Sequence, residues 1–86
     1  MDTKPILNIP VRVVDSSQIY GIGHDEATRT LAVRFKKAGE ASTLYHFSNV
    51  APETFAALRD AASIGSYFGK YIKAFPEQYP FQRISE

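Results

Sequence analysis

Hydrophobic and polar residues alternate from Thr30 to Lys36, and this pattern constrains the fold more than any other feature of the chain. Leu31, Val33 and Phe35 occupy every second position, with polar or small residues between them. Because successive side chains of a β-strand point to opposite faces, the alternation predicts a strand with one buried face. Such a strand needs further strands beside it and a layer over its apolar face.

Two segments before this strand also have strand composition. Val11 to Val14 is β-branched and apolar, and a polar turn follows it at Asp15, Ser16, Ser17 and Gln18. Ile19 to His24 predicts a second strand, with Tyr20, Ile22 and His24 on one face. Between them, Gly21 and Gly23 indicate a bulge or the close approach of another backbone segment.

The fourth predicted strand runs from Thr43 to Val50, after a hairpin loop at 37–41 that contains a glycine. It places Tyr45 and Phe47 on one face and His46 on the other. If the hairpin pairs in register with the preceding strand, the two rings belong to the core. If it does not, they form an exposed aromatic platform, and the sequence leaves both alternatives open.

Helical spacing replaces the strand pattern after Val50. Pro52 suits a first helical turn, and the apolar residues after it predict a short helix from about Pro52 to Ala61. Ser63 can cap a second helix, which Pro76 ends. The apolar stripe of that helix consists of Ile64, Phe68, Tyr71, Ile72 and Phe75.

Strands followed by helices predict an α+β fold, namely an antiparallel three- to four-stranded meander sheet followed by two short C-terminal helices packed on one face. The 86 residues suffice for one hydrophobic core. We predict a loosely ordered leader at 1–10, one domain at 11–75 and an aromatic tail at 76–86 that packs back over the sheet. The chain has no Cys, so packing alone must stabilise it. The expected core cluster is Phe35, Phe55, Leu58, Phe68 and Ile72.

The charge and hydropathy of the chain limit which kinds of molecule it can bind. The net charge of +1 is too small to give the strong positive field of dedicated nucleic-acid-binding proteins. The chain has neither a signal-peptide pattern nor an apolar stretch near the roughly 18 residues of a membrane span. We therefore expect a cytoplasmic protein with no membrane partner, whose oligomeric state the sequence does not indicate.

Four short motifs, each present once, follow one another between Val14 and Lys73. They are a Ser-Ser-x-Ile turn, an aromatic-x-aromatic strand, a Val and Pro at a helix start, and a Ser-x-Gly helix start followed by aromatic residues. The matching residues are Ser16, Ser17, Ile19, Tyr45, Phe47, Val50, Pro52, Ser63, Gly65, Tyr67 and Phe68. This order resembles the KTSC domain, a small family also found at the C-terminus of some lysyl-tRNA synthetases.

The chain departs from that pattern at three positions. Phe47 replaces a second Tyr, Ala51 is inserted between Val50 and Pro52, and His24 stands where Tyr is usual. The resemblance implies the fold and, through the synthetase context, RNA binding as a suggestion. It implies no catalytic residue.

The residues themselves indicate no active site. His24, Asp25, Glu26 and His46 are the available metal ligands or bases, but neighbours on a strand point to opposite faces and cannot converge. Ser16 and Ser17 are better explained by turn formation than as nucleophiles. The glycines match no nucleotide-binding loop. We therefore predict a protein that is not an enzyme and has no cofactor and no metal.

Two binding hypotheses remain. In the first, the chain binds RNA weakly through the helix start at Ser63, Gly65 and Ser66, with Lys70 and Lys73 nearby and a second patch of Arg34, Lys36 and Lys37. Three or four cations acting together predict a salt slope of about −2 to −3. In the second, the aromatic tail from Phe75 to Phe81 binds a protein partner.

Overall fold

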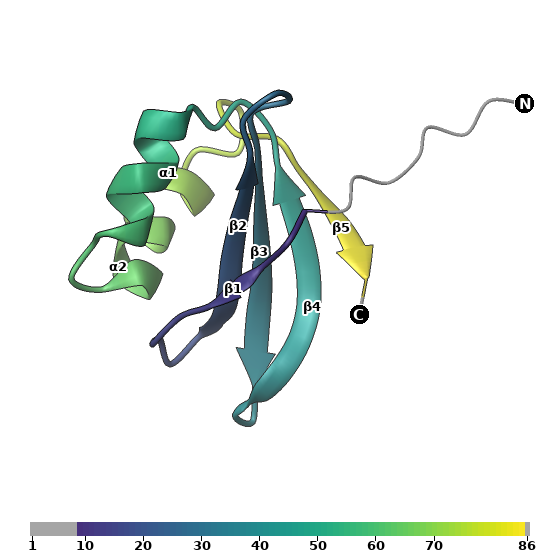
Figure 1. Ribbon diagram of the computed structural model, residues 1–86, viewed down its shortest axis with the longest axis vertical. Helices are drawn as coiled ribbons and strands as arrows, with labels where there is room; N and C mark the ends of the chain where they lie inside the picture. The colour runs from purple at the N-terminus through teal and green to yellow at the C-terminus, as the bar shows by residue number, and fades with distance from the viewer. Residues whose placement is uncertain (1–8, 86) are drawn as a thin grey trace, which may run out of the picture.

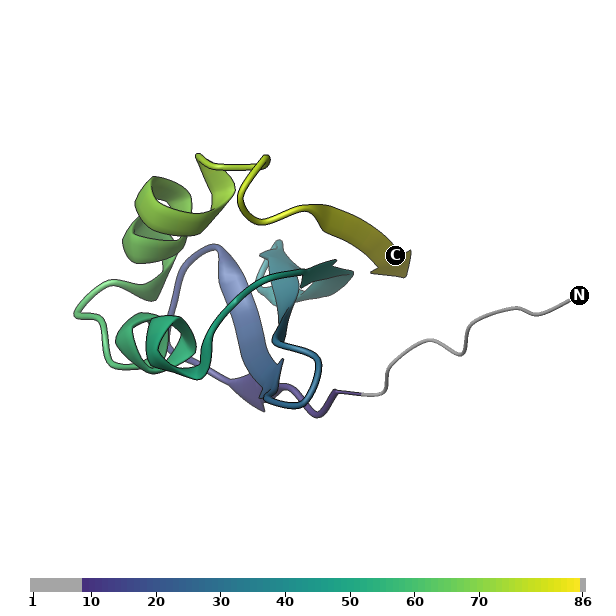
Figure 2. The ribbon, with the colours of Figure 1, turned by 90° about the horizontal axis from the view of Figure 1, so that it is seen from above.

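Five antiparallel strands form one sheet in chain order, and the helices lie on one of its faces (Figures 1 and 2). The computed structural model describes residues 9–85. The elements are β1 (Arg12–Val13), β2 (Ile19–Asp25), β3 (Thr30–Lys37), β4 (Glu40–Phe47), α1 (Pro52–Arg59), α2 (Ile64–Phe68), the π-helix η1 (Gly69–Lys73) and β5 (Phe81–Ser85). The predicted α+β class is confirmed, with five strands in place of the expected three or four.

The register of β3 with β4 decides which side chains face the helices. Leu31 lies opposite Phe47, and Val33 lies opposite Tyr45. The two rings therefore share the face of the apolar residues of β3. Phe47 is buried, and Tyr45 packs against the same cluster while partly exposed. Of the two alternatives for this pair, the core position is the correct one.

A bulge in β2 changes the predicted faces of that strand. Ile19 lies opposite Phe35, whereas Gly21 lies opposite Arg34, so Tyr20 is an additional residue that shifts the register. Ile19 and Ile22 consequently both face the core, and both are buried. Strict alternation along β2, on which the predicted faces rested, therefore fails across this bulge.

The two glycines of β2 allow close packing by the chain that precedes it. A Cβ atom on Gly23 would lie 1.9 Å from the carbonyl oxygen of Pro10, and one on Gly21 would lie 2.4 Å from Val11 Cγ1. No side chain fits at such distances, as the glycines in the sequence suggested. Residues 1–8 of the predicted leader lie outside the described residues, and Ile9 is buried.

The hairpin between β3 and β4 is tighter than predicted. Lys37 pairs with Glu40, so the loop consists of Ala38 and Gly39 alone. Both have positive φ, 54° and 82°, as in the two-residue turn whose twist matches that of the strands. This short loop sets Lys36 opposite Ala41, and a bulge between Lys36 and Arg34 then shifts the register by one residue, which brings Tyr45 and Phe47 opposite Val33 and Leu31 on the core face.

The helical segment that follows α1 differs from the single predicted helix. Ser63 caps α2 as expected, because its Oγ accepts the Ser66 N–H at 3.3 Å. After Phe68 the helix widens into η1. Ile64, Phe68 and Ile72 of the predicted stripe are buried, but Tyr71 and Phe75 are exposed. The wider turn changes the angular spacing on which the prediction rested.

The core lies between the sheet and the helices. Of the five residues predicted to form it, Leu58, Phe68 and Ile72 are buried in one cluster, whereas Phe35 and Phe55 are partly buried against it. Val50, which follows β4, is also fully buried. Within residues 9–85, no helix is long and apolar enough to cross a membrane.

The aromatic tail extends the sheet instead of packing over it. After Tyr79, which is buried, the chain enters β5 and pairs with β4, so that Phe81 lies opposite Phe47. The pairing continues into the loop, where the Ser48 N–H donates to the Pro80 carbonyl at 2.8 Å. The tail therefore contributes an edge strand and a core side chain.

Candidate functional site

The two histidines lie on opposite faces of the sheet. His24 lies opposite Leu31 on the helix side, where its ring stacks on Phe55 at 5.0 Å and its Nε2 lies 2.6 Å from the Val50 carbonyl oxygen. His46 lies opposite Ala32 and points to the other face. The described residues contain no group of three metal-ligating side chains. The suggested His and carboxylate cluster is therefore not assembled in this part of the chain.

Ser16 of the first turn bonds to the backbone of nearby residues. Ser16 Oγ accepts the N–H groups of Gln18 and Ile19, each at 3.3 Å. The Asp25 carboxylate likewise accepts the backbone N–H of Thr28 at 3.2 Å. These contacts are the turn roles that the sequence predicts for such residues.

The Ser-Ser turn and the Ser-x-Gly helix start face each other across a polar groove. This groove of about 420 Å³ is lined by residues 15–18 on one side and 62–66 on the other. Gly65 makes the approach possible, since a Cβ on it would lie 3.3 Å from Ser16 Oγ. Lys36 reaches the same turn and donates to the Ser16 carbonyl at 2.6 Å. Two motifs far apart in the sequence thus meet in space.

The basic residues predicted to bind RNA do not form one surface. Lys36 is bonded to the Ser16 carbonyl, and Arg34 donates to the Ser42 carbonyl at 2.6 Å from the strand position opposite Leu44. Lys37 lies beside the hairpin turn. Lys70 and Lys73 are on η1, and both are exposed. Of the predicted set, only these two lysines share one helical turn.

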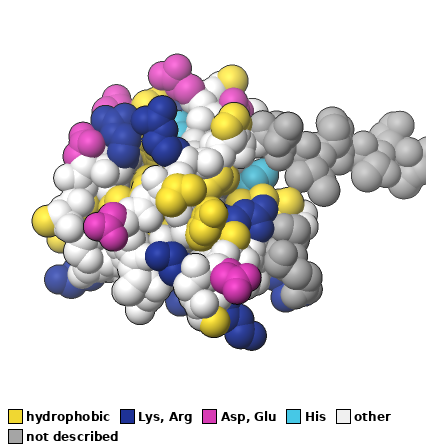
Figure 3. All heavy atoms as spheres, turned by 60° about the horizontal axis from the view of Figure 1, so that its bottom comes forward, with side chains coloured by type: hydrophobic (Ala, Val, Ile, Leu, Met, Phe, Trp, Pro, Cys, Tyr) yellow, Lys and Arg dark blue, Asp and Glu magenta, His cyan; other side chains and the backbone are white. Residues whose placement is uncertain are grey.

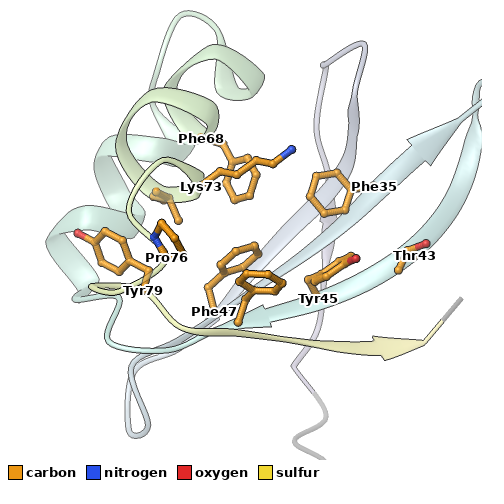
Figure 4. Close-up of a pocket in the computed structure, with 10 residues that line it drawn as sticks. Phe35, Thr43, Tyr45, Phe47, Phe68, Lys73, Pro76 and Tyr79 are labelled. Carbon is orange, nitrogen blue, oxygen red and sulfur yellow. The ribbon is translucent and has the colours of Figure 1, made fainter.

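A second cavity, not predicted from the sequence, lies between η1 and the sheet (Figure 4). Its volume is about 460 Å³. Strands β3, β4 and β5 supply one wall, formed by Phe35, Thr43, Tyr45, Phe47 and Phe81. Phe68, Ile72 and Lys73 form the helical wall, and the loop before β5 adds Pro76 and Tyr79. We call this space the aromatic cavity.

Aromatic rings in edge-on and tilted contact build the sheet side of the aromatic cavity. The centroid of Tyr45 lies 5.5 Å from that of Phe35 and 5.7 Å from that of Phe81. Phe81 also lies 5.6 Å from Phe47, yet it remains 55% exposed. These separations are typical of favourable ring pairs. The cavity is therefore a preformed aromatic surface that solvent still reaches.

Three polar groups surround this apolar wall. In Figure 4 the Lys73 side chain extends from the helix across the cavity toward Phe35. Among the described residues, the Lys73 ammonium forms no ion pair or hydrogen bond, and the same holds for the hydroxyls of Thr43 and Tyr45. A positive charge and two hydroxyls are thus available to a ligand.

The π-helix determines how the helical wall is formed. In η1, Ile72 is fully buried while the next residue, Lys73, is exposed, and both line the aromatic cavity. A π-helical turn is rare and is found frequently at functional sites. Its position at the cavity is therefore a second observation that distinguishes this region from the rest of the surface.

The sequence identified some of the residues that line the aromatic cavity, but not the strand pairing that brings them together. Tyr79 and Phe81 were identified as an aromatic tail, and Tyr45 and Phe47 as a pair on one strand face. Nothing in local periodicity indicates that β5 pairs with β4, because this contact joins segments separated by both helices. The cavity exists only through that long-range pairing.

The arrangement of an antiparallel meander with two helical segments on one face defines a small α+β domain. The model of the KTSC domain family matches residues 15–75. This chain belongs to that family, as its motif order suggested.

The chain is similar to two further proteins. It is 32% identical over 71 residues to an uncharacterized protein of Stutzerimonas stutzeri strain A1501, covering 83% of this chain and 92% of that protein. The crystal structure of a KTSC domain protein from Yersinia pestis has 26% sequence identity and a TM-score of 0.76. This likeness covers 91% of the present chain and 100% of the other, so it extends beyond residues 15–75.

Proposed function

We propose that this chain is a non-enzymatic module that binds single-stranded RNA weakly at the aromatic cavity. The observation that carries the proposal is a cavity with ring-lined walls and an unpaired lysine, Lys73, beside them. Aromatic rings stack on nucleobases without regard to sequence, and lysine contacts phosphate. Figure 3 shows one face with hydrophobic side chains in the middle and both basic and acidic side chains around them.

This proposal moves the RNA contact away from the start of α2. The Ser63 hydroxyl already accepts the Ser66 N–H, and the Ser63 carbonyl accepts the Tyr67 N–H. These bonds leave fewer amide groups for a phosphate than the sequence suggested. Lys73 lies at the aromatic cavity instead, with Lys70 in the same helical turn.

The absence of catalysis is part of the proposal. Several polar atoms that could act as bases or nucleophiles are engaged elsewhere, as with His24 Nε2 on the Val50 carbonyl and Ser16 Oγ on two backbone amides. A nucleophile needs a base within hydrogen-bond reach and an oxyanion site. The described residues provide no such arrangement at the aromatic cavity, where Lys73, Thr43 and Tyr45 are the polar groups nearest the rings.

The alternative is a protein-interaction module that uses the aromatic tail. The tail residues do not form a separate surface, because Tyr79 is buried and Phe81 lines the aromatic cavity. Phe75, which is 49% exposed, is the ring that stays outside both the core and the cavity. A protein partner that used the tail would therefore contact Phe75 in the first place.

The proposal is tested by titrating the ¹⁵N-labelled protein with short single-stranded RNA at low salt. The largest amide shifts are expected at Tyr45, Ile72, Lys73 and Phe81. The substitutions Lys70→Gln and Lys73→Gln should each weaken binding about two- to fivefold, as for exposed charge pairs. Arg12→Gln is the matched control, because β1 is the opposite edge of the sheet from β5.

Two results would contradict the proposal. The first is no shift at low salt, and the second is binding that Lys70→Gln and Lys73→Gln leave unchanged. Shifts confined to Phe75 and its neighbours would favour the protein-interaction alternative instead.

A further inference from the structure

We propose that the aromatic cavity holds one unstacked nucleotide, with the base stacked against the aromatic wall and the phosphate at Lys73. This inference rests on the proposed function and specifies the unit that the site recognises. It implies that a free mononucleotide is a sufficient ligand and that an RNA strand binds through one extruded base at a time.

The size of the aromatic cavity limits its occupant to one such unit. Its volume of about 460 Å³ lies in the lower part of the range for small-molecule sites, which is roughly 300–1,000 Å³. The sheet wall and the helical wall close it on two sides, so a second base stacked on the first would lie outside. The polar groove at residues 15–18 and 62–66 has no aromatic wall to receive that second base.

The chemistry of the lining favours a nucleotide over a hydrocarbon group. Tyr45 and Phe81 offer ring faces, and a planar base stacks on such faces. The hydroxyls of Thr43 and Tyr45 make no hydrogen bond to another described residue and can meet the polar edge of a base. An aliphatic side chain would desolvate both hydroxyls without pairing them, which is unfavourable.

Charge complementarity indicates where the phosphate lies. Lys73 is the cation that lines the aromatic cavity, and it has no carboxylate partner among residues 9–85. A ligand that combines a planar ring with a nearby anion can stack on the aromatic rings and contact the Lys73 ammonium together. An uncharged nucleoside can only stack, so comparing a nucleotide with its nucleoside tests the role of Lys73.

The experiment compares uridine and adenosine with their 5′-monophosphates, and both with a short oligouridylate, by amide shifts and by competition. Each monophosphate should shift Tyr45, Ile72 and Phe81, displace the oligouridylate, and bind about two- to fivefold more tightly than its nucleoside. Lys73→Gln should abolish this difference. Arg12→Gln should preserve it, because Arg12 lies on β1 at the opposite edge of the sheet from β5 and does not line the cavity.

Phe81 provides the matching test of the rings. Phe81→Ala should weaken monophosphate binding about fivefold or more, which corresponds to the loss of one stacking partner. Phe81→Leu retains apolar volume without a ring, and it should also bind more weakly while keeping the thermal midpoint closer to that of the wild type. Unchanged affinity in a folded Phe81→Leu protein would overturn the inference.

The two proposals fail separately. If the oligouridylate binds but neither monophosphate shifts the cavity residues or competes at millimolar concentration, the single-nucleotide inference is wrong and the RNA proposal stands. If neither the strand nor the monophosphates cause shifts, both are wrong. Free nucleotides that bind while the strand does not would indicate a small-molecule site and contradict the RNA proposal.

Discussion

His46 is buried on the face of the sheet that points away from the helices, where it lies opposite Ala32 and Gln82. Its side chain is only 8% exposed, and its Nε2 atom has no hydrogen-bond partner among the described residues. Burial lowers the pKa of His46 below its ordinary value of 6.5, because the charged ring loses hydration. An unpaired buried nitrogen costs about 1–3 kcal/mol of folding free energy.

This burial predicts that the protein loses stability on acidification. A histidine whose pKa is lower in the folded than in the unfolded chain binds fewer protons when folded. Its contribution to stability is therefore fully present above pH 6.5 and is lost as the pH falls through 6.5 toward the folded-state pKa. His46→Leu removes this group, so its unfolding free energy should depend less on pH between about pH 8 and about pH 5.

Urea denaturation of both proteins across that range measures the difference. His46→Leu should be at least as stable as the wild type near pH 5, since it leaves no buried unpaired nitrogen. If the two proteins lose stability in parallel, His46 is not the responsible group.

At the scale of elements, the segment Ile64–Lys73 combines two structures with different roles. Its α-helical half carries Phe68, whose ring lies 5.7 Å from Phe35 and 5.2 Å from Phe47, and so joins the helix to both central strands. Its π-helical half carries Ile72 and Lys73 to the aromatic cavity. Core packing therefore holds the same segment that lines the proposed site.

Truncation of Phe68 should destabilise the fold strongly. The side chain is 3% exposed, and Phe68→Ala would leave a cavity between helix and sheet that costs about 3–5 kcal/mol. The matched control is Phe75→Ala, since Phe75 is half exposed and its removal should cost less than about 1 kcal/mol. Thermal and urea melts measure both changes. A Phe68→Ala protein that melts within a degree or two of the wild type would show that α2 does not contribute to the core.

At the scale of the whole molecule, the near-neutral charge and the dispersed cations limit any polyanion binding. The net charge is +1, and the side chains of Lys36 and Arg34 are already engaged with the backbone carbonyls of Ser16 and Ser42. The slope of about −2 to −3 expected from the sequence assumed three or four cations acting together. In the structure, only Lys70 and Lys73 of the predicted cations share one helical turn, so we expect two cations to act together.

We therefore predict a slope of about −1.4 for log affinity against log salt with single-stranded RNA, because each neutralised phosphate contributes about −0.7. Fluorescence anisotropy of a labelled oligonucleotide at several salt concentrations gives this value, and Lys70→Gln should make the slope shallower by about 0.7. A slope of −3 or steeper would show that Arg34, Lys36 or Lys37 also contacts phosphate.

The amino-acid sequence by itself determined the elements whose signals are local. The alternation through Leu31, Val33 and Phe35 predicted β3, and Ser63 predicted the start of α2. Both follow from interactions within a few residues, namely strand pleating and the bond of a cap to the Ser66 amide. The motif order likewise identified the family, and with it the α+β class.

The tertiary structure alone decided the features that depend on which distant segments pair. The bulge at Tyr20 appears only when β2 is aligned with β3, and the burial of Ile72 in η1 arises from its packing in the shared core cluster. The aromatic cavity arises because β5 pairs with β4 and brings Phe81 beside Tyr45 and Phe47, across the two helices that separate them in the chain. Sequence periodicity reports the faces of one element, whereas register between elements is set by the packing of the whole core.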